Sequence, residues 1–404
     1  MQPSTSSAAL AGVTWLVGDA QAVMAMPRVP ALRPFDEAVL SYLDDASRAL
    51  LRDPASRAFP DVVTFAFWAR RASTEGLAAR FAGRGGGLRL GRGTVFHVAP
   101  SNVPVNFAYS LAAGLLAGNA CVVRVPSREF EQVGIVARAL GSALGGHPVM
   151  RGRVALARYG HEREVNDALS SLCDARVVWG GDATVADLRR SPLPSRATEV
   201  TFADRCSVAV IDAGAYLAEP DRAAVARAFY NDTYLTDQNA CTSPCVVAWT
   251  GEGAPRAREA FWAELHALVA SRYDLQPVRA VSKLASADLA AVALEGARVE
   301  PALDNLVTRV SVPEVDARLF DLRDSCGLFF EVEIADVSEL RPLLDDPRCQ
   351  TVGYLGDPAP LRELVAGGLR GVDRVVPVGK TMDFDLLWDG YDLVSALTRT
   401  VVVL

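Results

Sequence analysis

The sequence predicts an α/β protein with two α/β domains, each built around a parallel sheet, and a short C-terminal strand segment. Short β-branched runs alternate with helical stretches at intervals of about 25–30 residues, which is typical of βαβ units. Of the residues, 50% are hydrophobic and 22% are charged, a composition that supports buried cores rather than disorder. A length of 404 residues allows two or three domains of about 150 residues each.

The charge pattern excludes several classes of partner. The formal net charge is -7 and no basic run occurs, which argues against binding to nucleic acid or anionic membranes. The segment from Thr94 to Val123 contains 30 consecutive residues without Asp, Glu, Lys or Arg. Because Pro100, Asn102 and Pro104 interrupt it, we expect buried structure there instead of a membrane span. The first cation is Arg28, so the N-terminus lacks the basic region of a signal peptide.

The number and spacing of the cysteines indicate the cellular compartment of the protein. The seven cysteines include no CxxC pair and no Cys/His spacing typical of a metal site. An odd number of cysteines without such a framework suits a reducing environment. We therefore expect a cytoplasmic protein without a bound metal.

The first 222 residues are expected to contain a lead-in and a sheet domain. Residues 1–34 read as a loosely ordered lead-in, and residues 35–222 as a helical N-terminal segment followed by the sheet. Helical spacing of apolar residues predicts helices over 36–51 and 61–81. The strands predicted for this sheet cover 95–98, 121–125, 153–157, 175–179 and 207–211. This alternation is that of a dinucleotide-binding domain, although no GxGxxG follows the first strand.

The remaining chain predicts a second α/β domain and a return segment. Residues 223–379 form this second domain, with strands expected at 245–249, 306–312, 329–334, 351–355 and 375–378. Residues 380–404 end in a β-branched strand over 400–404. A strand this short is marginal by itself, so we expect it to pair with a sheet in this chain or in another subunit.

A polar loop from Asn231 to Pro244 contains the best candidate nucleophile, Cys241. Loops that a rigid scaffold positions often hold reactive groups. The alternative is that Cys241 is a small buried apolar residue, the commoner role of a cysteine that is not in a disulfide. The other cysteines either begin apolar strands or lack a supporting pattern, and the four histidines are expected to be structural.

Three further positions have a functional and a structural interpretation. Asn102 lies in a strand-to-helix turn, where it could be a helix cap or an amide donor to an oxyanion. Gly180 and Gly181 follow a strand and precede a helix, so they could admit a phosphate or form an ordinary turn. Arg124 ends the second strand, where it could meet a ribose or phosphate or face solvent.

Several ordered motifs resemble the aldehyde dehydrogenase superfamily and, within it, the LuxC-type acyl-CoA reductases. The resemblance extends from about Phe35 to the C-terminus. The motifs that carry it are PDVVTFAFWARR from Pro60, APSNVP from Ala99, LAGN from Leu116, DQNACTSP from Asp237 and LWDGYD from Leu387. This superfamily binds its cofactor without GxGxxG. The resemblance therefore implies an aldehyde dehydrogenase-like fold with a Rossmann-like cofactor domain.

The same resemblance implies roles for particular residues. Cys241 corresponds to the acyl-accepting nucleophile and Asn102 to the oxyanion donor, while Gly180 and Gly181 occupy the phosphate turn. Arg124 falls where many relatives have a lysine near the adenosine ribose. Ser127 falls where NAD-preferring relatives often have a glutamate, and Arg128 follows it, so NADPH is the expected cofactor.

One departure from the superfamily concerns water activation. Oxidising relatives carry an ELGGK block whose glutamate activates the hydrolytic water, whereas this chain reads TEVTFADR from Thr198. Glu199 is nearby but out of register. Loss of that block suits a reductase, which must avoid hydrolysing its own thioester.

These observations predict NADPH-dependent reduction of an acyl thioester, such as an acyl-CoA, to an aldehyde through an acyl-Cys241 enzyme. The alternatives are NAD(P)-dependent aldehyde oxidation and a non-redox, acyl-carrying role beside an acyl-activating enzyme. Expected partners are the acyl thioester, an acyl-activating enzyme or carrier protein, and further copies of the chain in a homo-oligomer.

Overall fold

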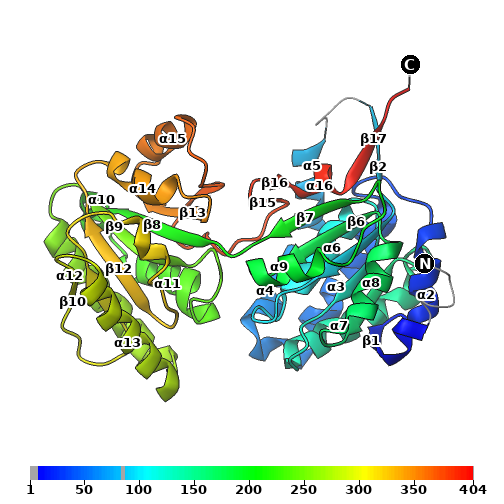
Figure 1. Ribbon diagram of the computed structural model, residues 1–404, viewed down its shortest axis with the longest axis horizontal. Coiled ribbons are helices and arrows are strands. Elements are labelled where there is room, and N and C mark those ends of the chain that lie inside the picture. Colours follow the sequence, from blue (N-terminus) through cyan, green and yellow to red (C-terminus); the bar gives the residue numbers. More distant parts are fainter. Residues whose placement is uncertain (1–7, 83–86, 404) are drawn as a thin grey trace. The chain divides into compact units, whose positions relative to one another are not determined.

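The computed structural model describes residues 8–82 and 87–403 and divides the chain into two compact units (Figure 1). The first unit comprises residues 1–203 and 385–404, and the second comprises residues 204–384. The sequence placed the corresponding boundaries after residues 222 and 379. The first boundary differs because the strand expected at 207–211 belongs to the second sheet.

The first unit contains a six-stranded sheet in the order β1-β5-β4-β3-β6-β7. All neighbouring pairs are parallel except β1 with β5. The strands are β1 (Thr14–Val17), β3 (Thr94–Val98), β4 (Ala120–Arg124), β5 (Val154–Arg158), β6 (Ala175–Trp179) and β7 (Thr198–Phe202). Sequence patterns located β3, β4, β5 and β6 but missed β1 and β7.

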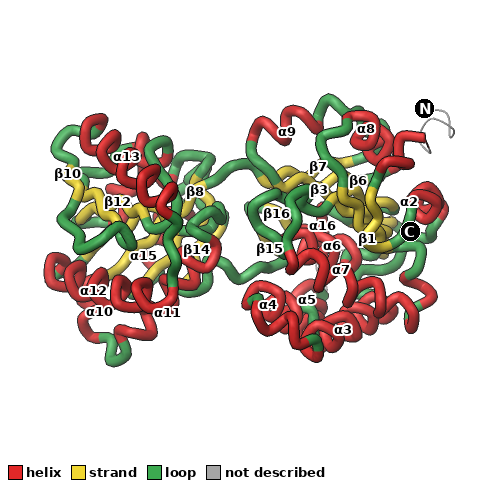
Figure 2. The backbone as a smooth tube through the Cα atoms, turned by 90° about the horizontal axis from the view of Figure 1, so that it is seen from below, coloured by secondary structure: helices red, strands yellow, loops and turns green. Residues whose placement is uncertain are grey.

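Helices cover both faces of this sheet (Figure 2). One face packs against α2 (Ala20–Ala25), α8 (Arg163–Leu172) and α9 (Asp182–Leu188). The helices of the other layer include α3 (Glu37–Arg52), α6 (Asn106–Leu116) and α7 (Glu131–Ala143). The charge-free segment forms β3, α6 and β4, and every residue of the two strands is buried. In the described parts of the chain, no helix has the length and apolarity needed to span a membrane.

The lead-in is more ordered than the sequence suggested. Its described part adds β1 to the edge of the sheet, with Thr14 opposite Arg158. Asp19 then caps α2 by accepting a hydrogen bond from the backbone N–H of Ala22 at 2.7 Å. Val23 and Met26 are buried in the core beneath them, so these residues are an integral layer of the first unit.

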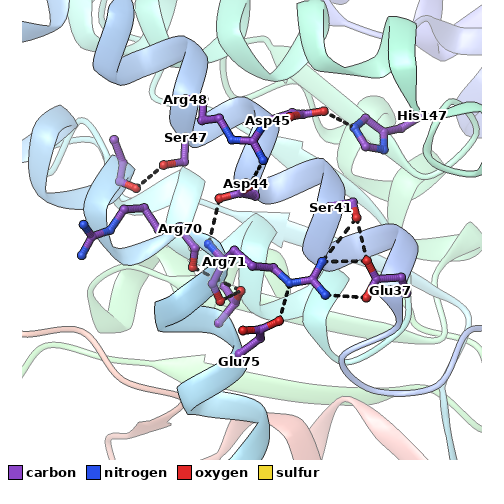
Figure 3. A network of polar contacts seen from close by, with 12 residues as sticks. Glu37, Ser41, Asp44, Asp45, Ser47, Arg48, Arg70, Arg71, Glu75 and His147 are labelled. Carbon is purple, nitrogen blue, oxygen red and sulfur yellow. Dashed lines mark hydrogen bonds and ion pairs between the residues drawn. The ribbon is translucent and has the colours of Figure 1, made fainter.

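The helix expected over 61–81 is two helices, α4 (Pro60–Trp68) and α5 (Arg71–Phe81). The break occurs at Arg70, whose backbone is extended, because the backbone N–H of Arg71 donates to Asp44 at 2.9 Å instead of to a helical carbonyl. The Arg71 guanidinium also bridges Glu37 on α3 and Glu75 on α5, each at 2.6 Å (Figure 3). Arg71 therefore links α3 to α5.

The second unit contains a seven-stranded sheet in the order β10-β11-β12-β9-β8-β13-β14. Only the β10–β11 pair is antiparallel. The strands are β8 (Cys206–Asp212), β9 (Pro244–Thr250), β10 (Arg298–Val299), β11 (Thr308–Ser311), β12 (Leu328–Glu333), β13 (Cys349–Leu355) and β14 (Arg374–Pro377). The placement of strand 207–211 in the first domain was wrong, because β8 pairs with β9 on one side and β13 on the other.

Two helical layers also enclose the second sheet (Figure 2). On one face lie α10 (Ala213–Ala218), α11 (Arg222–Thr233) and α12 (Ala254–Arg272), packed around Phe229, Trp249 and Phe261. On the other face lie α13 (Pro277–Ala293), α14 (Arg341–Leu344) and α15 (Ala359–Ala366). The helix α13 is 17 residues long.

The C-terminal strand pairs within its own chain. A hairpin of β15 (Leu387–Trp388) and β16 (Tyr391–Asp392) precedes α16 (Leu393–Ala396) and β17 (Thr398–Val401). The β17 strand pairs antiparallel with β2 (Leu88–Gly91). The expected strand 400–404 is thus shifted toward Thr398, and Leu404 lies outside the described residues. Pairing with β2 gives this short strand a partner without a second subunit.

Candidate active site

Six of the seven candidate residues lie at the carboxyl edge of the first sheet. The chain runs from β3 outward through β4 to β5, and then crosses back to place β6 on the other side of β3. The loops after β3 and β6 therefore leave the same edge in opposite directions. Such a switch point is the usual ligand crevice of an open α/β sheet. Asn102 lies in the loop after β3, and Gly180 and Gly181 lie in the loop after β6.

A buried hydrogen-bond chain fixes the two strands at this switch point. Ser110 on α6 lies 2.7 Å from Nδ1 of His97 on β3 and accepts a 2.9 Å hydrogen bond from the indole N–H of Trp179 on β6. Burial lowers the pKa of His97 to about 3, so its imidazole is neutral. His97 is structural, as expected from the sequence, and it helps hold the strands from which the Asn102 and Gly180 loops emerge.

Arg124 is engaged by its own unit. Its guanidinium donates to the carbonyl of Gly160 and lies 4.9 Å from the centre of the Tyr159 ring. The residue as a whole is 8% exposed. These contacts give Arg124 a structural role at the end of β4, and its expected contact with the cofactor stays a prediction.

Ser127 and Arg128 are exposed in the loop after β4. The Arg128 guanidinium lies 5.1 Å from the centre of the Phe130 ring. The neighbouring Glu129 pairs with Arg158 at 3.4 Å, which offsets its negative charge. This loop therefore presents an exposed cation and a hydroxyl at the same sheet edge as Asn102.

The Gly180–Gly181 turn leaves room beside the sheet edge. The backbone N–H of Gly180 donates to Phe202 at 3.1 Å, which anchors the turn to β7. A Cβ at Gly180 would meet the Thr184 side chain at 3.1 Å, whereas one at Gly181 would meet nothing within 4 Å. Asp182 follows directly and is an acidic residue in the first turn of α9.

Glu199 is committed to an ion-pair network on β7. One carboxylate oxygen accepts hydrogen bonds from the buried Arg176, and the other accepts one from Arg189 at 2.8 Å. Burial raises the pKa of this carboxyl, but the bonds from the two arginines outweigh it and hold the pKa below its ordinary value. A carboxylate held ionised by two cations is a poor general base.

Cys241 lies in the second unit, three residues before the start of β9. All seven cysteines are in described residues, and six are buried while Cys241 is partly exposed. Burial raises the pKa of Cys173 to about 12 and also raises the pKa values of Cys121 and Cys349. Those thiols are protonated at neutral pH and are shielded from reagents. The structure thus separates Cys241 from the others by accessibility.

The loop before Cys241 is shaped by Gln238. Asp237 and Gln238 both have positive φ angles, 52° and 56°, and reverse the chain after α11. The Gln238 amide donates to the carbonyls of Pro244 at 2.9 Å and Leu328 at 3.0 Å, and its oxygen accepts from the N–H of Gly327 at 2.9 Å. One side chain therefore ties both ends of the nucleophile loop to the sheet.

Contacts from β8 and the 379–382 segment complete the loop's support. The Ser207 hydroxyl donates to the carbonyl of Cys241 at 2.7 Å, and Thr242 donates to the sulfur of Met382 at 3.0 Å. No sequence pattern predicted the supporting roles of Gln238, Ser207 and Met382. Gln238 precedes Cys241 by three residues in the DQNACTSP motif. Its place in this motif was the one sequence feature that could have pointed to it.

Asp232 on α11 forms a second, unpredicted anchor. Its carboxylate accepts hydrogen bonds from the backbone N–H groups of Gly379 at 2.6 Å and Thr381 at 3.1 Å. The side chain is fully buried, and burial raises its pKa to about 6. Asp232 therefore holds the segment that contacts Thr242.

The raised pKa of Asp232 predicts a pH-dependent stability. The folded protein binds this proton more tightly than the unfolded chain, whose carboxyl has the ordinary pKa of 3.8. The stabilisation is full below pH 3.8 and is lost as pH rises to about 6, a change of about 3 kcal/mol. Urea unfolding of the wild type and Asp232→Asn across this range measures the difference. In Asp232→Asn, the unfolding free energy should change less with pH than in the wild type. The exposed control Asp288→Asn should keep the wild-type pH dependence. The same pH dependence in the wild type and Asp232→Asn would contradict the assignment.

Lys283 on α13 is buried among backbone carbonyls. Its ammonium donates to Cys326 at 2.8 Å and also to Asn305, and burial lowers its pKa to about 8. The N–H of Cys326 in turn donates to the carbonyl of Asp237 at 2.9 Å. Lys283 thus supports the turn that holds the nucleophile loop.

In the described residues, no cluster of three or more His, Cys, Asp or Glu side chains could hold a metal ion.

Sequence comparisons identify related reductases. A profile of the family described as acyl-CoA reductase (LuxC) matches residues 87–402. The long-chain acyl-protein thioester reductase of Vibrio harveyi is 28% identical over 164 residues. Long-chain acyl-protein thioester reductase 2 of Photobacterium leiognathi is 22% identical over 165 residues. Each match covers 40% of this chain and 33% of the relative, so the similarity spans about a third of the relatives' length.

Solved structures identify the fold. Lactaldehyde dehydrogenase from Escherichia coli aligns with a TM-score of 0.65 at 15% identity, covering 100% of this chain and 91% of that chain. Indole-3-acetaldehyde dehydrogenase, solved in complex with NAD+, aligns with a TM-score of 0.67 at 15% identity, covering 94% and 86%. The chain therefore has the aldehyde dehydrogenase fold, and the match over residues 87–402 shows that it belongs to the acyl-CoA reductase (LuxC) family.

Proposed function

We propose that this protein reduces an acyl thioester to the aldehyde with NADPH, through an acyl group carried on Cys241. The observation that carries the proposal is the environment of Cys241. It is the partly exposed cysteine of the seven, on a loop held by Gln238 and Ser207. An accessible thiol on a fixed loop is what a nucleophile requires, and the family match supports an acyl substrate.

In the first half-reaction the Cys241 thiolate attacks the carbonyl carbon of the thioester. The resulting tetrahedral oxyanion collapses, the bond to the leaving thiolate breaks, and the acyl group stays on Cys241. We propose the backbone N–H of Cys241 and the side-chain amide of Asn102 as donors to the oxyanion. Asn102 belongs to the first unit and Cys241 to the second. The role proposed for each residue is therefore supported by contacts within its own unit.

In the second half-reaction a bound NADPH supplies the hydride that reduces the enzyme-bound thioester. The hemithioacetal on Cys241 then breaks its carbon–sulfur bond, which releases the aldehyde and restores the thiol after one proton is taken up. Overall, acyl thioester, NADPH and a proton give aldehyde, free thiol and NADP+. The commitment of Glu199 to Arg176 and Arg189 removes it as a base for hydrolysis, which supports release as aldehyde rather than acid.

We propose that the sheet edge of the first unit binds the dinucleotide. Gly181 is open to approach and Arg128 is exposed, while Arg124 shapes the end of β4. The cation of Arg128 favours the 2′-phosphate of NADPH. Because position 127 is a serine and not a glutamate, no carboxylate at that position repels the phosphate. We therefore propose Ser127 and Arg128 as the residues that distinguish the two nicotinamide cofactors.

A product assay tests the proposed reaction. The protein is incubated with NADPH and a panel of acyl- and aryl-CoA thioesters or an acylated carrier protein, and aldehyde and released thiol are quantified. Equal amounts of aldehyde, thiol and oxidised cofactor are expected. Steady formation of acid from aldehyde with NAD(P)+ would instead indicate the oxidative alternative, and absence of nicotinamide binding in calorimetry would indicate the non-redox alternative.

A double substitution tests the cofactor preference. Ser127→Glu with Arg128→Gln removes a cation and adds a carboxylate, so the ratio of kcat/KM for NADPH to that for NADH should fall about 10²-fold. Initial-rate kinetics with both cofactors give this ratio. Arg399→Gln, an exposed change on β17, is the matched control and should leave the ratio unchanged. A double variant that keeps the wild-type ratio would refute the assignment.

A further inference from the structure

The helix α13 is buried on one side and exposes apolar side chains on the opposite side. Its inner side places Lys283, Ala287 and Ala290 against the unit's interior, each no more than 1% exposed. The opposite side carries a second apolar stripe, which is exposed: Val278 (69%), Val281 (70%), Ala285, Leu289 (65%) and Val292 (87%). At 100° per residue, the centre of this outer stripe lies nearly half a turn from the centre of the inner one. The interior of the unit therefore does not account for it.

The exposed area matches one side of a stable interface. The outer stripe presents on the order of 500 Å² of apolar surface, near the upper limit for the largest patch of a typical monomer. A standard protein interface takes about 800 Å² from each partner, of which about 60% is apolar. The stripe therefore supplies roughly the apolar area that one partner needs.

The spacing of the outer stripe is symmetric about Ala285. Val281 and Leu289 lie four residues to either side, and Val278 and Val292 lie seven residues to either side. In an antiparallel pair of identical helices centred on Ala285, Val281 meets Leu289 of the other copy and Val278 meets Val292. The smallest side chain lies at the crossing point, where two helices must approach most closely.

The charges on α13 also allow self-association. Arg279 and Asp288 are exposed and lie six residues before and three residues after Ala285. Because these offsets are unequal and on opposite sides, neither charge faces its own copy across a two-fold axis. The third charged residue, Lys283, is on the inner side and donates to backbone carbonyls.

We propose that the outer stripe of α13 is a two-fold interface at which a second copy of this chain docks antiparallel, centred on Ala285. An isologous contact requires one surface to complement itself, and the symmetric spacing of the stripe meets that requirement. The proposal does not depend on the catalytic assignment, since it uses no residue of the Cys241 loop or of the first unit.

Sedimentation velocity of the full-length chain tests the association. The wild type should sediment as a dimer or an even multiple, and Val281→Arg with Leu289→Arg should halve the molar mass. Val149→Arg and Val403→Arg, at exposed apolar positions in the first unit, are matched controls and should keep the wild-type mass. A monomeric wild type, or a double arginine variant with unchanged mass, would overturn the proposal; the former would leave the stripe to a different partner.

Cross-linking tests the geometry without destabilising the fold. Ala285→Cys should be linked to its own copy by a short bismaleimide, and Val278→Cys alone should link far less. An equal mixture of Val278→Cys and Val292→Cys should link efficiently. The wild type reports any background from Cys241. Failure of Ala285→Cys to link above this background would overturn the two-fold arrangement even if the arginine variants did not fold.

Discussion

Cys241→Ala should lose the covalent acyl-enzyme and at least about 10⁴-fold of the thioester-dependent oxidation of NADPH. Alanine provides no nucleophile, and the six other cysteines are buried, so no neighbouring thiol replaces it. Intact-mass spectrometry after incubation with an acyl-CoA, without reductant, measures the adduct directly. The wild type should gain one acyl group and the variant none.

The matched control is Cys173→Ala, which removes a buried thiol of the first unit. It should keep both the adduct and the activity. Nicotinamide binding by Cys241→Ala, measured by calorimetry, should remain close to that of the wild type, because the residues proposed for the cofactor belong to the other unit. An acyl adduct that persists in Cys241→Ala would exclude this residue as the acyl acceptor.

Gln238→Ala should reduce both stability and activity. The substitution leaves the carbonyls of Pro244 and Leu328 and the N–H of Gly327 without their buried partner. We expect a loss of about 2–4 kcal/mol in the free energy of unfolding. A nucleophile displaced by about 1 Å costs roughly 10²-fold in rate, so kcat should fall by a comparable factor.

Two variants separate positioning from a general loss of folding. Gln238→Glu keeps an acceptor for Gly327 but loses both donors, and it should lie between the wild type and Gln238→Ala in kcat. Gln276→Ala, an exposed glutamine before α13 whose side chain makes no capping bond, should match the wild type. The rate of alkylation of Cys241 by iodoacetamide reports the thiol's environment. If Gln238→Ala kept the wild-type kcat and the wild-type rate of Cys241 alkylation, Gln238 would not be a positioning residue.

Local sequence patterns predicted much of the fold because burial on both faces leaves a strong signal. The strands β3, β4 and β6 are buried along their whole length and contain valine pairs or alternating valines, and their parallel arrangement follows from the helices between them. Which sheet receives a strand is a tertiary property. Like β6, the strand β8 is a buried run that contains valines, yet it pairs with β9 and β13, so alternation alone placed it in the wrong unit.

The sequence predicted the site residues that have a reactive or characteristic side chain. It did not predict those whose role depends on contacts with distant parts of the chain. Cys241 and Asn102 were proposed from residue type, context and family resemblance. Gln238, Asp232 and Lys283 act by binding backbone groups that are distant in the sequence, so no local pattern signals them. The enclosure of Arg124 by Tyr159 and Gly160 likewise depends on the neighbouring strand β5 and the loop after it.

The buried ammonium of Lys283 gives the second unit a built-in reporter of local opening. The sequence contains two lysines, and the other, Lys380, has a largely exposed side chain. An amine-reactive label should therefore modify Lys380 at once and Lys283 only when α13 separates from the carbonyls that surround it. The labelling rate of one residue then gives the opening free energy of the structure that supports the nucleophile loop, without any substitution in the chain.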